Sequence, residues 1–76
     1  MDDIPQPFSL EDLPPLASPA EIALTAHFPN GPKFVPGEPG VVCAHRLSAD
    51  GLVSIGVRTE DGRIFWSATR KAFRFG

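Results

Sequence analysis

The chain contains 76 residues, has a formal net charge of −2 and carries a single cysteine. This length allows one domain, and the core of such a domain is small enough that a partner would add substantially to its stability. A single cysteine excludes an intramolecular disulfide and a four-cysteine zinc site, and a lone thiol is typical of a reducing compartment. The sequence has no apolar stretch near the roughly 18 residues of a membrane span and no secretory leader pattern. We therefore expect a cytoplasmic protein without a membrane segment.

Charge is distributed unevenly along the chain. Residues 1–32 contain five acids and no base, residues 33–50 are balanced, and residues 51–76 contain five bases against two acids. Such asymmetry between the halves of a chain indicates an acidic tail and a basic binding surface.

Residues 1–18 are predicted to form a disordered acidic arm that lies outside the core of a β domain at residues 19–76. Five of the nine prolines fall within residues 1–19, and proline both removes a backbone donor and disfavours helix in the residue before it. Apolar side chains among the acids would let the arm order on a partner protein. These candidate docking residues are Phe8, Leu10, Leu13 and Leu16.

The segment that follows the arm fits two structures. Ser18, Pro19 and Glu21 form a capping box and predict a helix over residues 19–27. Apolar residues alternate with others over residues 22–28, which predicts a strand. We favour the strand because Pro29 follows Pro19 too closely for an ordinary helix, and the helix remains the alternative.

From residue 41 onward the sequence has the pattern of β-structure. Apolar runs predict strands at 41–47, 52–59 and 63–68 and a short closing strand at 73–75. Asp-Gly pairs at 50–51 and 61–62 lie between these runs, and Asp-Gly in that position is a strong hairpin signal. We expect a mainly β fold, either a small SH3-like barrel or a curled antiparallel sheet of four or five strands.

The first hairpin is expected to turn in a three-residue loop at 49–51. This loop pairs Leu47 with Val53 and Cys43 with Val57 across the two strands. Val42 then lies on the opposite face of its strand.

The second hairpin has two registers to choose from. A two-residue turn puts Ile64 and Trp66 on the core face and leaves Phe65 outside, whereas a three-residue loop shifts the register by one and reverses these faces. We favour the two-residue turn because it buries more apolar surface and pairs Glu60 with Arg63.

The sequence does not indicate catalysis or a cofactor. His27, Cys43 and His45 are the soft metal ligands of the chain, and three such residues without a fourth do not make a typical zinc site. Asp50 and Asp61 precede glycines in turns, where a carboxylate satisfies nearby backbone donors. We expect no metal, no cofactor and no enzymatic activity.

The basic C-terminal third predicts a binding surface. Cations beside an exposed aromatic ring on a sheet suit single-stranded nucleic acid, because the charges meet phosphates and the ring stacks on a base. The leading hypothesis is an accessory or regulatory module that binds nucleic acid, with the acidic arm competing for the same surface. The candidate contacts are Arg58, Arg63, Phe65, Arg70, Lys71 and Arg74.

Residues 33–76 resemble the SH3-like small barrels of the KOW and Tudor type. The resemblance rests on the segment 34–42, FVPGEPGVV, followed by two hairpins and by a short turn at 67–72 that leads into residues 73–75. It departs from that pattern at Pro39, where those modules continue into a strand, and in lacking tyrosine for an aromatic cage. Such barrels bind nucleic acid, peptides or other subunits, so the resemblance implies binding without naming the ligand.

The alternative hypothesis is a protein-interaction module. In that case the arm or a sheet edge docks on a larger protein, or two copies of the chain associate. A small core and an exposed edge strand both favour association.

Overall fold

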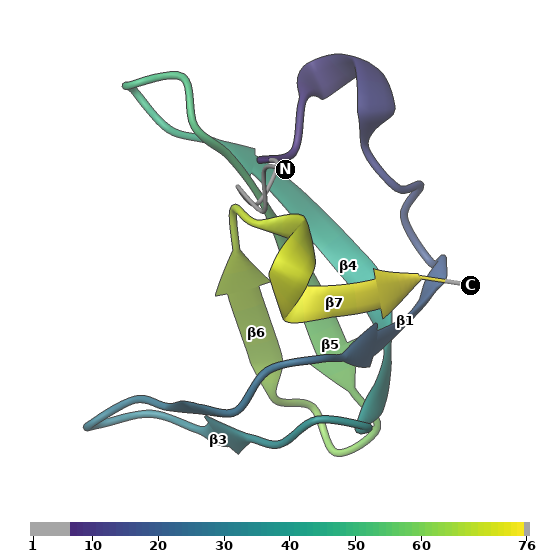
Figure 1. Ribbon diagram of the computed structural model, residues 1–76, viewed down its shortest axis with the longest axis vertical. Coiled ribbons are helices and arrows are strands. Elements are labelled where there is room, and N and C mark those ends of the chain that lie inside the picture. The colour runs from purple at the N-terminus through teal and green to yellow at the C-terminus, as the bar shows by residue number, and fades with distance from the viewer. Residues whose placement is uncertain (1–6, 76) are drawn as a thin grey trace, which may run out of the picture.

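The computed structural model describes residues 7–75 and is mainly β. A five-stranded antiparallel sheet has the order β6-β5-β4-β1-β7, and a separate two-stranded sheet is formed by β2 and β3 (Figure 1). The strands are β1 (Pro19–Ile22), β2 (Ala26–His27), β3 (Lys33–Phe34), β4 (Pro39–Leu47), β5 (Val53–Thr59), β6 (Ile64–Ser67) and β7 (Phe73–Phe75). Two 3-10 turns, η1 (Leu10–Asp12) and η2 (Arg70–Ala72), complete the elements. The mainly β prediction is confirmed, and within residues 7–75 the sheet is open, with β6 and β7 at its edges.

The predicted strands from residue 41 onward are all present, as β4 to β7. The strand favoured at residues 22–28 is present only in part, because β1 ends at Ile22 and β2 occupies only residues 26–27, in a different sheet. The alternative helix over 19–27 is wrong. Ser18 caps no helix, and its Oγ instead donates to the carbonyl of Pro15 at 2.5 Å. Because β1 lies between β4 and β7, it is paired on both sides and buries Ala20 and Ile22.

The first hairpin turns in the predicted three-residue loop, and Leu47 pairs with Val53. The predicted pairing of Cys43 with Val57 is wrong, because a β-bulge at Cys43 shifts the register and Val42 takes that place. The bulge adds one residue to β4 and so turns Val42 into the core, where it is 1% exposed.

The predicted register of the second hairpin is also wrong. The Thr59 N–H donates to the carbonyl of Arg63 at 2.8 Å and so encloses a three-residue loop. Gly62 ends this loop at φ 94°, a conformation that glycine adopts without strain. Phe65 consequently pairs with Val57 and is buried, with 6% of its surface exposed.

Both hairpin loops are built by the same local chemistry. Their sequences are Ser48-Ala49-Asp50-Gly51 and Thr59-Glu60-Asp61-Gly62. In each loop the hydroxyl donates to the aspartate carboxylate two residues later, and the glycine has a positive φ. This arrangement stabilises a three-residue loop where an Asp-Gly pair alone would also suit a two-residue turn.

The core lies on the inner side of the curled sheet and includes a residue of the arm. Phe8 is only 3% exposed, and its ring centroid lies 6.4 Å from that of Phe73 and 6.2 Å from that of Phe75. The prediction that the arm lies outside the core is therefore wrong at Phe8; residues 1–6 of the arm lie outside the described residues. The buried apolar residues are Phe8, Ala20, Ile22, Phe34, Val42, Val53, Ile55, Val57, Phe65, Ala72 and Phe73.

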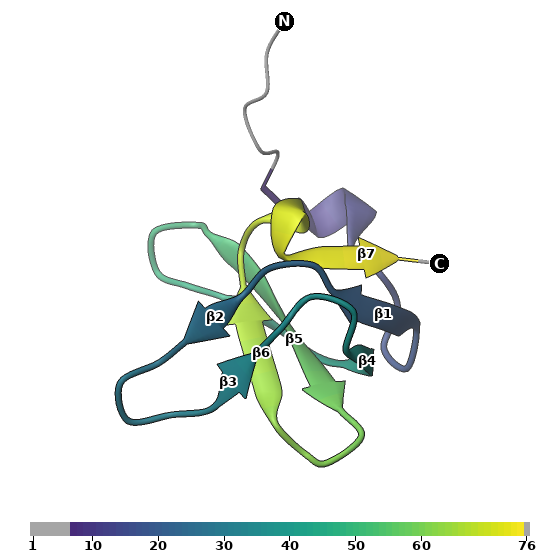
Figure 2. The ribbon, with the colours of Figure 1, turned by 60° about the horizontal axis from the view of Figure 1, so that its bottom comes forward.

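Figure 2 shows η1 beside η2 and β7, and Asp12 of η1 pairs with Arg70 of η2, so the first and last described segments are neighbours. Across residues 7–75 the structure contains no helix with the length and apolar character needed to cross a membrane.

Candidate functional site

Three of the predicted nucleic-acid contacts are held in ion pairs with acids of the same chain. Arg63 pairs with Glu38 and Asp61, and the other two arginines pair with acids of the arm and of β1. Phe65 is buried and has no face for a base. Arg58 on β5 and Lys71 in η2 remain exposed.

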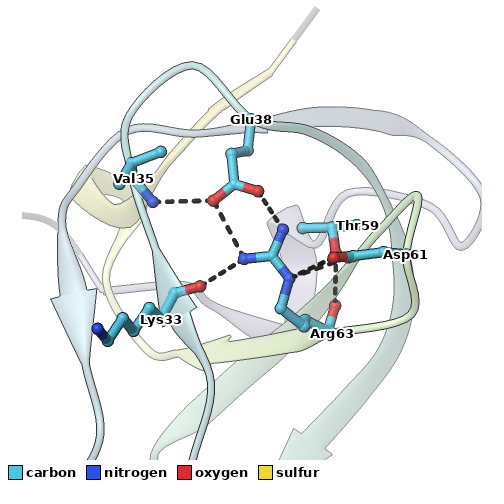
Figure 3. Close-up of polar contacts among 6 residues, drawn as sticks. All are labelled: Lys33, Val35, Glu38, Thr59, Asp61 and Arg63. Atoms are coloured by element: carbon cyan, nitrogen blue, oxygen red, sulfur yellow. Dashed lines mark hydrogen bonds and ion pairs between the residues drawn. The ribbon is translucent and has the colours of Figure 1, made fainter.

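Arg63 lies at the centre of a polar clamp that joins two loops (Figure 3). Its guanidinium donates to the Asp61 carboxylate at 2.9 Å, to the Glu38 carboxylate and to the carbonyl of Lys33. The Val35 N–H donates to the same Glu38 carboxylate at 2.9 Å. The clamp therefore ties the connection between β3 and β4 to the loop between β5 and β6, which is a structural role.

The charges of the clamp stabilise one another. Hydrogen bonds lower the pKa of Asp61 to about 2; the bond from Thr59 has the largest effect and the bond from Arg63 the second largest. Hydrogen bonds from Arg63 and then from the Val35 N–H lower the pKa of Glu38, and both carboxylates raise the pKa of the Arg63 guanidinium. All three groups are ionised at neutral pH, so the positive charge of Arg63 is already balanced inside the protein.

Arg70 and Arg74 are paired with acids from the first part of the chain. Arg70 Nη2 lies 2.5 Å from Asp12 Oδ2, and its guanidinium carbon lies 5.0 Å from the centroid of the Phe8 ring. Arg74 Nη1 lies 3.6 Å from Glu21 Oε1. The acidic arm thus neutralises one C-terminal base through Asp12.

The four predicted docking residues of the arm lie in different environments. Phe8 is buried and Leu13 is packed against the core, whereas Leu10 is 65% exposed and Leu16 is 58% exposed. Two of the four therefore remain on the surface of the arm.

The three candidate metal ligands are not brought together as a metal site. Within residues 7–75, no group of three or more His, Cys, Asp or Glu residues is placed to hold a metal ion. Cys43 lies at the bulge of β4, and His45 Nε2 lies 2.7 Å from the carbonyl oxygen of Pro14. His27 is exposed on β2.

An apolar and basic surface lies on the outer face of β4, β5 and β6 and is continued by the connection between β2 and β3, and we call it the indole face. Its register follows from the corrected second hairpin, which turns Ile64 and Trp66 outward. Trp66 is the single tryptophan of the chain. The members of the indole face are Phe28, Pro32, Arg46, Arg58, Ile64 and Trp66.

A shallow apolar pocket lies within the indole face. It is lined by Phe28, Pro32, Ile64 and Trp66 and has a volume of about 240 Å³. Phe28 is 41% exposed and Ile64 is 39% exposed, so both offer apolar surface to a ligand. Clusters of exposed apolar groups ringed by polar ones are typical of interaction sites.

Phe28 is held in place from behind by two core rings. Its ring makes edge contacts with Phe34 and Phe65, with ring centroids 6.4 Å and 6.1 Å apart. The outer surface of Phe28 is thus supported by the core.

Gly56 provides the space in which the indole lies against β5. A Cβ at this position would come within 3.2 Å of two Trp66 ring atoms and of Ile64 Cγ2. A glycine in the middle of a strand is unfavourable for the strand itself, and it often marks a close approach by another group. Here that group is the ring of Trp66.

Sequence reasoning missed the indole face because it placed Trp66 in the core and Phe65 outside. It also did not select Arg46 or Phe28. The available signal was Gly56, because a glycine in the middle of a predicted strand often marks a site where a large group approaches the backbone.

Comparisons of the chain with protein-family models, with curated proteins and with solved structures found no match. Function is therefore inferred from the side chains of residues 7–75.

Proposed function

We propose that the protein is a non-enzymatic interaction module that docks on a larger protein through the indole face. The observation that carries this proposal is the exposed apolar pocket lined by Trp66 and Ile64, with Arg46 over the indole ring and Arg58 paired with Ile64 on the neighbouring strand. Neither arginine forms an ion pair within the described part of the chain. Apolar surface next to uncompensated positive charge fits a partner segment that carries an apolar side chain between carboxylates.

The position of the pocket favours an extended segment. β6 is an edge strand of the sheet in residues 7–75, and its residues Ile64 and Trp66 line the pocket. An extended peptide can pair with the free edge of a strand while alternate side chains enter pockets beside it. We propose that the partner segment runs along β6, inserts an apolar side chain beside Trp66 and places acids near Arg46 and Arg58.

Single-stranded nucleic acid is the second candidate ligand. The stacking of Arg46 on Trp66, with Arg58 exposed on the same face, favours it. The net charge of −2 and the ion pairs of Arg63, Arg70 and Arg74 favour the protein ligand. If Arg46 and Arg58 each neutralise one phosphate of a single strand, the logarithm of the binding constant falls with the logarithm of the salt concentration with a slope of only about −1.4.

We also propose that the fold is a variant of the SH3-like small barrels. The strand order β6-β5-β4-β1-β7 supports this proposal, as does the short turn η2 immediately before β7. The proposal concerns the fold alone, since this class of domain binds unrelated ligands.

The test of the proposed function is selection of ligands from a random-peptide display library. We expect the wild-type protein to enrich peptides in which an apolar residue is flanked by Asp or Glu. The variants Trp66→Ala and Arg46→Ala remove the apolar wall and the nearby charge, so we expect each to lose this enrichment. Arg74→Ala is the matched control for Arg46→Ala because Arg74 lies on β7 and is largely exposed.

Nucleic acid is tested in parallel with oligothymidylate as the probe. The chain contains one tryptophan and no tyrosine, so its intrinsic fluorescence reports on Trp66. The proposal predicts little change on adding oligothymidylate at moderate salt. It would be overturned by strong quenching that weakens with salt, or by peptide enrichment that is the same for wild type and Trp66→Ala.

A further inference from the structure

We infer that the N-terminal arm is exchanged between two copies of this chain, so that Phe8 of one copy fills the core of the other. The inference does not rest on the proposed function, because Phe8 lies in the core whereas the indole face lies on the outside of the sheet.

Phe8 occupies a slot formed by the C-terminal part of the chain and the start of β5. It forms an isolated antiparallel bridge with Val53, and Pro7 forms one with Thr69. The Phe8 N–H donates to the carbonyl of Ala68 at 3.3 Å. The arm therefore enters the domain as an added extended segment with one buried anchor.

The chain between this anchor and β1 lies on the surface of the domain. None of residues 9–18 is buried. The contacts that tie this stretch to the domain include the Asp12–Arg70 ion pair, the packing of Leu13 against the core and the approach of His45 Nε2 to the carbonyl of Pro14 at 2.7 Å. At its C-terminal end, backbone hydrogen bonds join Ala17 and Ser18 to Val42 of β4. The arm can leave its slot without disrupting the sheet.

The turn that joins the arm to β1 is strained. The Ser18 N–H donates to the carbonyl of Pro15 at 3.1 Å, and Ala17, the third residue of this four-residue turn, has φ 72°. A turn of this kind favours glycine or asparagine at its third position because Cβ crowds the backbone at positive φ. Ala17 therefore favours opening of the turn.

Exchange between two copies preserves the contacts of the arm and removes this strain. Phe8, Asp12 and Pro14 of one copy would contact the other copy as they contact their own domain in the monomer. The bonds that are lost are those from Ser18 to the carbonyl of Pro15 within the turn, and the one from the Ala17 N–H to the carbonyl of Val42 at 2.7 Å, because the peptide of Ala17 rotates when the turn opens. Short hinges under strain invite such exchange, and it is opposed by the loss of these hinge bonds and by the entropy of association, which concentration offsets.

We assign the segment that fills the slot to a second copy of the chain, because the arm of this chain already fits the slot. Every copy of the chain carries Phe8 followed by Asp12, which matches the slot and Arg70 respectively. A foreign segment would have to compete with an arm that is tethered to its own slot at high effective concentration.

The test is disulfide cross-linking between two full-length variants, both also carrying Cys43→Ser. One carries Pro7→Cys and the other Thr69→Cys, since these positions face each other across the bridge, and partners in such a bridge lie within disulfide reach. After mixing and mild oxidation, we expect a heterodimer cross-linked between positions 7 and 69, with a yield that rises with concentration. Pro7→Cys mixed with Asn30→Cys, in the exposed loop between β2 and β3, measures random collisions.

Substitution of Ala17 tests the hinge in the same assay. Ala17→Val increases the strain of the turn, and we expect it to raise the yield of the cross-link about fivefold; Ala17→Gly relieves the strain, and we expect a fall of about fivefold. Ala49→Val is the control for the valine change because Ala49 is an exposed loop residue whose φ is not positive.

The inference would be overturned if the mixture of Pro7→Cys and Thr69→Cys gave no more cross-link than the Asn30→Cys control at every concentration. It would equally be overturned if a chain carrying both Pro7→Cys and Thr69→Cys formed only the bond within one chain. If Ala17→Val does not fold, the mixture with the wild-type hinge still decides the question.

Discussion

The guanidinium carbon of Arg46 lies 4.0 Å from the centroid of the Trp66 ring. Arg46 comes from β4 and Trp66 from β6, so this contact spans the outer face of β5 between them. A guanidinium over an indole is a favourable arrangement, and it keeps a positive charge next to the apolar pocket. The contact is possible because Gly56 of β5 has no side chain to separate the ring from the sheet.

The substitution Gly56→Ala tests whether the indole of Trp66 lies against β5 at this glycine. The new Cβ pushes against the Trp66 ring, which lies on the outer face and can move outward. We therefore expect the emission of Trp66 to shift to longer wavelength. Replacing a glycine within a strand offsets part of the cost of moving the ring, so the free energy of unfolding should change by less than about 1 kcal/mol. Ser54→Ala, on the same strand, is the control and should leave the emission unchanged. An unchanged emission in Gly56→Ala would show that the indole does not lie against β5.

The burial of Phe8 predicts that the arm contributes to the stability of the domain. Phe8→Ala removes a core ring, and we expect it to lower the free energy of unfolding by about 3–5 kcal/mol in urea denaturation. Leu10→Ala removes a side chain that is 65% exposed, so we expect a change within about 0.5 kcal/mol. Equal effects of the two substitutions would contradict the placement of Phe8 in the core.

The clamp around Arg63 predicts a dependence of stability on pH. The pKa of Asp61 is lowered from 3.8 to about 2 and that of Glu38 is lowered from 4.5, so between these values the unfolded chain binds more protons than the folded one. The contribution of the clamp is complete above about pH 5 and is lost as the pH falls toward about 2. The urea midpoint should fall over this range.

The same titration in Asp61→Asn isolates the clamp. Asparagine keeps a carbonyl acceptor for Thr59 but has no charge to titrate, so we expect a shallower fall of the urea midpoint with decreasing pH. Glu60→Gln is the control, because Glu60 is an exposed neighbour in the same loop. If the urea midpoint fell as steeply with decreasing pH in Asp61→Asn as in wild type, Asp61 would not contribute to the pH dependence.

The positions of the later strands could be predicted from the sequence, but the register of the second hairpin could not. The strands are marked by apolar runs and by Asp-Gly pairs, which are local signals. An Asp-Gly pair suits both a two-residue and a three-residue loop, and the three-residue loop carries the hydrogen bond between Thr59 and Asp61. Because of that one-residue difference, Phe65 lies in the core and Trp66 on the outer face, the reverse of the predicted arrangement. The candidate site was therefore not predicted from the sequence.

The arm could not be placed from the sequence because its anchor is non-local. Proline content correctly indicated little regular structure near residues 7–18, where η1 is the single element. Phe8, however, packs against Phe73 and Phe75 at the far end of the chain, and no local pattern reports such a contact. The same holds for the pairing of Arg70 with Asp12, which changed the predicted basic surface.

The most direct test of the proposed function is a proton–nitrogen correlation spectrum of the protein during titration with an acidic, apolar peptide obtained by display selection. The single tryptophan gives one indole N–H resonance. We predict that this resonance moves together with the backbone amides of Ile64, Trp66 and Phe28, and that the amides of Phe8 and Phe73 stay in place. Shifts that gather around Phe8 and Phe73, with the indole resonance unmoved, would contradict the assignment of the indole face as the binding surface.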